Sequence, residues 1–170
     1  LTELNVSNCG LSTLSGLEKA TSLKILNAGN NTIRNLEPLP GMGQLTELYL
    51  QHNAVTDLTV VGSLSNLSVL DVSYNALNSI APLSGSIRLT KLNAANNQIS
   101  DVSTASSLPI LEELQLDYNG LSDISGLSGC TNLTTLTVSN NQITDLSAIA
   151  GLSKLQKLDF SYNGVSTLPE

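Results

Sequence analysis

Leucine recurs along this chain at a fixed interval of 22 residues. If each of these leucines is taken as place one of a unit, a second leucine stands at place four of every unit. The first series is Leu1, Leu23, Leu45, Leu67, Leu89, Leu111, Leu133 and Leu155, and the second is Leu4, Leu26, Leu48, Leu70, Leu92, Leu114, Leu136 and Leu158. Place six is always apolar, and places eleven and fourteen always hold Leu, Ile or Val. A period without insertions indicates one array of seven full units and a partial eighth, with no domain boundary.

Within each unit, polar and apolar residues alternate around places three to seven. This alternation predicts a short β-strand whose residues at places four and six face inward, while places three, five and seven face outward. Because a 22-residue coil must return to its start before the next strand, successive strands pair in parallel at about 4.8 Å. The leucines then point into the coil, and each coil buries them only by stacking on its neighbours. We therefore expect an α/β solenoid with one parallel sheet.

Place nine holds Cys9 in the first unit and asparagine in the other seven. The resulting pattern, L-x-x-L-x-L-x-x-N-x-[ILV], resembles the leucine-rich repeat family over the whole chain. Its 22-residue unit is similar to the SDS22-like and internalin-like classes, and residues 97–101 (NQISD) and 141–145 (NQITD) are similar to bacterial internalin repeats. The resemblance implies a right-handed solenoid of eight units. Its parallel sheet would lie on the concave side, with loops or short 3-10 turns on the convex side.

Two polar places in the unit have a structural interpretation. Asparagine at place nine can satisfy backbone groups left unpaired where the strand leaves the sheet. Place thirteen always holds a residue type that caps helices: Thr13, Asn35, Asp57, Ser79, Asp101, Asp123, Asp145 and Thr167. The three consecutive aspartates in this row would also suit a calcium ion. Capping of a helical turn on the convex side explains all eight residues, so we expect caps and no metal site.

Composition narrows the classes of partner. The chain has 14 acidic and 7 basic residues, a net charge of −7 and no apolar run near the roughly 20 residues of a membrane span. Nucleic acids and anionic membranes require clusters of Lys and Arg, so neither is an expected partner, and we expect no membrane insertion. Aromatic residues make up 3% of the chain, which leaves the core to aliphatic side chains.

Few residues suggest catalysis or a cofactor. His52 is the only histidine, and no phosphate-binding glycine loop or paired metal ligands occur. Cys9 and Cys130 lie five units apart, about 24 Å along the sheet, whereas a disulfide requires Cα atoms within about 7 Å. Cys130 occupies a place held by Met or Leu in four other units, so we interpret it as a buried apolar side chain. We expect no enzyme activity and no cofactor.

The outward places of the strands are free to encode a partner, since the repeat fixes the core and the turns. Exposed strand faces are the usual binding surfaces of solenoids. All four tyrosines lie at place five or place eight, beside this face, and tyrosine is a frequent anchor in protein interfaces. We predict a protein-binding site across units three to six, formed by Glu47, Tyr49, Gln51, His52, Asp71, Tyr74, Lys91, Asn93, Glu113, Gln115, Asp117 and Tyr118.

The resemblance leaves two kinds of protein open. An internalin-like surface protein would use the module as an adhesin or receptor binder, at the cell surface or after secretion. An SDS22-like intracellular protein would use it as a scaffold or as the regulatory subunit of an enzyme such as a protein phosphatase. The repeat details slightly favour the first, and two unpaired thiols weakly favour the second. Because no polar segment covers either end of the array, we expect residues 1–170 to be a single domain taken from a longer chain.

Overall fold

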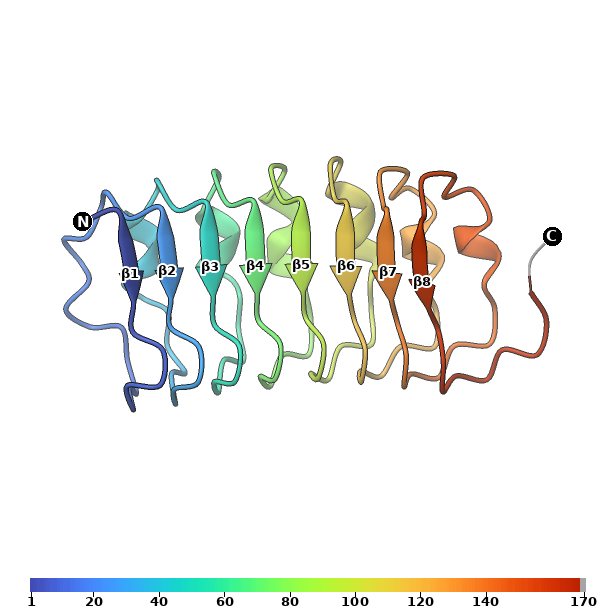
Figure 1. Cartoon of the computed structure of the whole chain (residues 1–170), viewed down its shortest axis with the longest axis horizontal. Coiled ribbons are helices and arrows are strands. Elements are labelled where there is room, and N and C mark those ends of the chain that lie inside the picture. Colours follow the sequence, from blue (N-terminus) through green and yellow to red (C-terminus); the bar gives the residue numbers. More distant parts are fainter. Residues whose placement is uncertain (169–170) are drawn as a thin grey trace.

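Eight short strands form one parallel sheet in the computed structural model, which describes residues 1–168. Each strand covers places three to five of its unit, and the strands follow one another across the sheet in chain order (Figure 1). Their bounds are β1 (Glu3–Asn5), β2 (Ile25–Asn27), β3 (Glu47–Tyr49), β4 (Val69–Asp71), β5 (Lys91–Asn93), β6 (Glu113–Gln115), β7 (Thr135–Thr137) and β8 (Lys157–Asp159). Equivalent residues of neighbouring units stand side by side, as Leu48 does beside Leu70.

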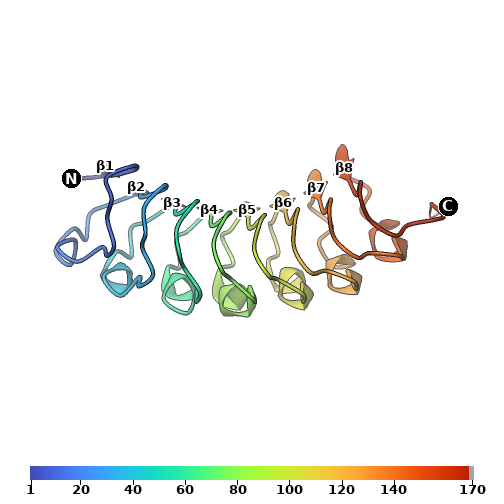
Figure 2. The same cartoon turned by 90° about the horizontal axis from the view of Figure 1, so that it is seen from below.

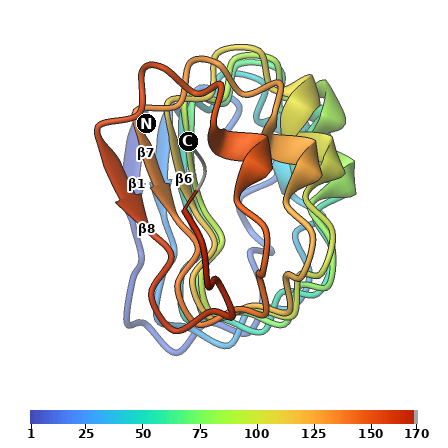
Figure 3. The same ribbon diagram turned by 90° about the vertical axis from the view of Figure 1, so that its right-hand side faces the viewer.

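Short 3-10 turns lie on the opposite side of the coils in units two to seven. Their bounds are η1 (Leu39–Gly41), η2 (Val61–Ser63), η3 (Ala81–Gly85), η4 (Ser103–Ser107), η5 (Ser125–Leu127) and η6 (Ser147–Ile149). The array curves so that the sheet lines its concave side and the turns its convex side (Figure 2), and the end-on view shows the coils stacked on one another (Figure 3). The expected leucine-rich repeat solenoid is confirmed. None of the helical segments within residues 1–168 is long and apolar enough to cross a membrane.

Aliphatic side chains fill the space between the sheet and the turns. The leucines at places one and four of units two to seven are at most 1% exposed. At the two ends of the array this burial is incomplete, so that Leu158 is 37% exposed. Cys130 is buried as expected, and removal from water raises the pKa of its thiol to about 11. Cys9 is exposed, and neither cysteine forms a disulfide.

A ladder of asparagines at place nine joins each unit to the preceding one. In the fifth unit, the Asn97 side-chain oxygen accepts the backbone N–H of Leu77 at 3.0 Å. Its amide group donates to the carbonyls of Val72 at 3.0 Å and Ala94 at 3.1 Å. All seven asparagines make these three contacts with equivalent residues. The structural interpretation of place nine is confirmed, because one side chain satisfies backbone groups of two coils.

The capping prediction for place thirteen is wrong in its position. Asp101 accepts the backbone N–H of Ser103 at 2.7 Å, and equivalent bonds occur in the first seven units. The N-cap residue of η4 is Val102, whose side chain makes no capping hydrogen bond. Place thirteen therefore forms a turn ahead of the N-cap, one residue before it in η3 to η6 and three residues before it in η1 and η2. The bonds from Ser103 lower the pKa of Asp101. Among the described residues, no group of three His, Cys, Asp or Glu side chains could hold a metal ion.

We predict that Asn97→Ala lowers the free energy of unfolding by about 3 kcal/mol, because a buried N–H and two carbonyls lose their partner. Urea denaturation followed by circular dichroism measures this change. Gln98→Ala is the matched control, since Gln98 is the exposed neighbour and its side chain makes no hydrogen bond among the described residues. Equal stability of the Asn97→Ala variant and the native chain would contradict the structural role of the ladder.

Candidate functional site

The concave face is formed by the side chains at places three, five and seven of the strands and their continuations. The leucine at place four of each strand points away from it into the core, as the register requires. The structure places all twelve predicted site residues on this face or along its edge at place eight. Nine of them line two adjoining hollows, which share Asn93 and Gln115, and three line neither.

The first of these, the central hollow, lies over β3 to β6. Its predicted members are Tyr49, Asp71, Lys91, Asn93, Glu113 and Gln115. The hydroxyl of Tyr49 donates to the carboxylate of Glu47 at 2.7 Å, and Asp71 is the strand partner of Tyr49 in β4. This hydrogen bond, partial burial and the two carboxylate charges raise the pKa of Tyr49 to about 12. The hydroxyl is therefore held in one direction as a neutral donor.

Other charges of the central hollow are already engaged within the chain. Lys91 Nζ lies 2.8 Å from the carboxylate of Glu113, its strand partner, and this bond raises the pKa of the ammonium group. Asp71 accepts the N–H and the hydroxyl of Ser73 at 3.0 and 2.7 Å, and the amide of Asn93 at 3.3 Å. The polar floor of this hollow is thus fixed by cross-strand contacts before any partner arrives.

The second, the tyrosine hollow, extends over β5 to β8 beside the place-eight edge. Its lining residues are Ser73, Tyr74, Asn93, Ala95, Asn96, Gln115, Asp117, Tyr118, Thr137, Ser139, Lys157 and Asp159. Asp117 accepts the hydroxyl of Thr137 and, at 2.8 Å, the backbone N–H of Ser139. Small residues at place seven, including Ala95, leave room above the sheet. These small residues were missed as site members in the sequence, although their row at place seven was visible there.

Place eight has a left-handed backbone in every unit. Its eight residues have φ between 54 and 57°: Asn8, Asn30, His52, Tyr74, Asn96, Tyr118, Asn140 and Tyr162. Asparagine is tolerated in this region, whereas a bulky residue there costs about 1 kcal/mol or more. The three tyrosines are nonetheless 49%, 55% and 81% exposed, in chain order. An unfavourable backbone at exposed aromatic rings points to a role outside folding.

Three predicted residues line neither hollow. Glu47 holds the hydroxyl of Tyr49, and His52 stacks on Tyr74 with ring centroids 4.0 Å apart and planes 12° apart. Gln51 lies over Gly29, where an added Cβ would come within 2.5 Å of its amide nitrogen. The Gln51 side-chain oxygen is enclosed without a hydrogen-bond partner within residues 1–168. Gln51 therefore packs against the sheet and offers the least to a partner.

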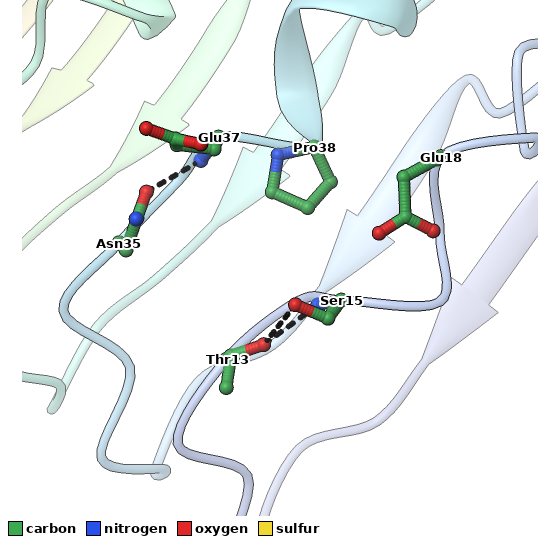
Figure 4. Close-up of a pocket in the computed structure, with 6 residues that line it drawn as sticks. All are labelled: Thr13, Ser15, Glu18, Asn35, Glu37 and Pro38. Atoms are coloured by element: carbon green, nitrogen blue, oxygen red, sulfur yellow. Dashed lines mark hydrogen bonds between the residues drawn. The ribbon is translucent and has the colours of Figure 1, made fainter.

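A further pocket lies on the convex side, between the first two units (Figure 4). Its lining residues are Thr13, Ser15, Glu18, Asn35, Glu37 and Pro38. The polar groups here serve the turns: Thr13 accepts the N–H of Ser15 at 2.8 Å, and Asn35 accepts the N–H of Glu37 at 2.8 Å. We assign no binding role to this pocket, because the side chains of Thr13, Glu18 and Asn35 bond to the local backbone.

We predict that Tyr162→Asn raises the free energy of unfolding by about 0.5 kcal/mol, since Asn suits the left-handed backbone and the ring is mostly exposed. Thermal denaturation measures the difference. The control variant is Tyr162→Ala, which removes the ring without supplying a residue suited to this conformation. An Asn variant no more stable than the Ala variant would contradict the assigned backbone cost.

We also predict that Glu47→Ala moves the pKa of Tyr49 from about 12 towards the ordinary value near 10. The raised pKa stabilises the folded state below pH 10, and this contribution is lost as the pH rises from 10 to 12. Tyrosinate absorbance, with Tyr49→Phe identifying the signal of this residue, measures the titration. Glu113→Ala removes a carboxylate that does not contact Tyr49 and should leave the titration unchanged.

Comparisons with known proteins agree with this architecture. A family model described as leucine-rich repeats, two copies, matches residues 1–41, 44–85, 87–129, 111–151 and 131–170. No curated protein sequence matches the chain. Among solved structures, an internalin (inlF) from Listeria monocytogenes superposes with a TM-score of 0.91 at 36% identity, covering 95% of this chain and 48% of that one.

Two further structures extend the comparison. Internalin C2 (inlC2) from Listeria monocytogenes has a TM-score of 0.78 at 30% identity, covering 94% of this chain and 80% of that one. A leucine-rich repeat protein of Leptospira interrogans has a TM-score of 0.92 at 27% identity, covering 98% and 44%. The chain thus spans about half the length of the first and third proteins. From the family matches along its whole length and its likeness to internalins, the chain belongs to the leucine-rich repeat family.

Proposed function

We propose that this chain is a non-enzymatic module that binds a protein partner on its concave face, as an internalin-like adhesin or receptor binder at the cell surface. Its fold is that of a protein-interaction module, and the two similar structures at 36% and 30% identity described above are internalins. The likeness to internalins favours this role over that of an SDS22-like intracellular scaffold or phosphatase subunit.

One observation carries the proposal: every tyrosine of the chain lies on the concave face or its edge, and three of them occupy a left-handed backbone position. The fold does not require those rings, because other units have asparagine at the same place. Tyrosine supplies a large contact area at little cost in side-chain entropy. His52 extends this aromatic edge by stacking on Tyr74, an arrangement that suits a contact surface better than catalysis.

The charges on the same face support a specific orientation of the partner. Tyr49 and Asp71 are held by hydrogen bonds within the central hollow, so that ordering them on binding costs little further entropy. Half-buried carboxylates beside an oriented hydroxyl would recognise donor groups on a protein surface. The polar groups of the central hollow are therefore ordered before a partner binds.

The test is the binding of the fluorescently labelled domain to cultured animal cells, measured by flow cytometry. We expect a double variant, Tyr49→Ala with Asp71→Asn, to raise the apparent Kd about tenfold, the effect of losing an interface anchor. Asparagine at position 71 keeps an acceptor for the Ser73 N–H and so spares the fold. Asp101→Asn is the control, because it changes the same charge on the convex side. Equal losses in both variants, or none in the double variant, would overturn the proposal.

A further inference from the structure

The tyrosine hollow has aromatic walls. Tyr74 and Tyr118 both line it and stand two units apart, about 10 Å at two strand spacings. Asn96 holds the same place in the unit between them, and Ala95 before it is small and only 8% exposed, which leaves room above the sheet beside the rings. The rings themselves are about half exposed. A flat group entering the hollow from the concave side would therefore contact one of two exposed aromatic rings.

The floor of the tyrosine hollow holds a fixed negative charge. Asp117 is half-buried, and each of its carboxylate oxygens accepts one hydrogen bond, from Ser139 and from Thr137. Thr137 and Ser139 are themselves buried, at 7% and 8% exposure, so the carboxylate cannot easily turn away. A carboxylate accepts about four hydrogen bonds, and Asp117 thus keeps acceptor capacity towards the hollow.

The described part of the chain provides no cation that pairs with Asp117. Its single ion pair joins Lys91 to Glu113. Lys157 also lines the hollow, but its charge acts on Asp159 in the same strand, whose pKa is lowered by hydrogen bonds from Ser161 and by Lys157. A half-buried carboxylate without a counter-ion attracts an external cation more strongly than one in open water.

From this geometry we infer that the tyrosine hollow binds an arginine side chain of the protein partner, with the guanidinium stacked against Tyr74 or Tyr118 and bonded to Asp117. The inference rests on the proposed function, since it specifies what the bound protein presents. A guanidinium is planar, stacks on aromatic faces and donates several N–H bonds to carboxylates. A lysine ammonium lacks the planar surface. The net charge of −7 steers the same class of basic partner towards the molecule.

The experiment is a titration of the isotope-labelled protein with N-acetyl-arginine amide, followed by nuclear magnetic resonance. We expect the backbone N–H signals of Ala95, Tyr118 and Ser139 to shift together with a Kd on the order of 10 mM, typical of one side chain. N-acetyl-citrulline amide has the same shape without the charge, and N-acetyl-lysine amide has the charge without the plane. Both should bind at least about fivefold more weakly.

Two variants separate the two parts of the site. Asp117→Asn keeps one acceptor, for the Ser139 N–H, and its amide can donate to the Thr137 hydroxyl, but it removes the charge. Tyr118→Asn removes a ring where other units have asparagine. Each should weaken the arginine compound about fivefold or more while the remaining signals stay native. Asp101→Asn is the matched control on the convex face and should leave the titration unchanged.

Three results would overturn the inference: no localised shifts with the arginine compound, equal binding of the citrulline compound, or a native titration in Asp117→Asn. The probe is a single amino acid, so its outcome does not depend on whether cells bind the domain. A negative titration together with loss of cell binding in the Tyr49 and Asp71 variant would reject the arginine site alone. A positive titration with unimpaired cell binding in that variant would reject the proposed role of the central hollow alone.

Discussion

The asparagine at place nine is the contact on which the regular stacking of coils depends. Each of these side chains bonds to backbone groups of its own unit and of the preceding one, as Asn97 does with Ala94, Val72 and Leu77. The groups that it satisfies lie where the chain leaves the sheet, so no strand neighbour could take its place. Because the same bonds recur between every pair of neighbouring units, each coil has a fixed position and orientation relative to the next.

This fixed stacking separates the residues that build the fold from those available for recognition. The strands are only three residues long, yet exact register brings place three, place five and place seven of every unit into continuous rows. Residues of the same row then interact across neighbouring strands: Lys91 pairs with Glu113, and Asp71 bonds to Asn93. The recognition surface is therefore preorganised by the same parallel pairing that buries the leucines.

At the place-eight edge, the backbone conformation determines where aromatic side chains stand beside the concave face. The chain turns out of the sheet here through a left-handed residue, which asparagine adopts with little strain. Where tyrosine or histidine takes this place, the fold accepts an unfavourable conformation and gains a ring directed beside the concave face. Tyr74 and Tyr118 thereby become walls of a hollow whose floor carries Asp117.

The sequence by itself determined the architecture of this protein, because a 22-residue period of inward leucines has one way to bury them: parallel coils stacked on each other. It also identified the structural asparagines and the face that carries the tyrosines. Tertiary structure alone decided which predicted residues lie together, since side-chain contacts depend on rotamers and backbone angles that a repeat pattern does not contain. It arranged nine of the predicted residues around two adjoining hollows, set Gln51 against Gly29, gave place eight its left-handed backbone, and put the N-caps of the convex-side turns after place thirteen.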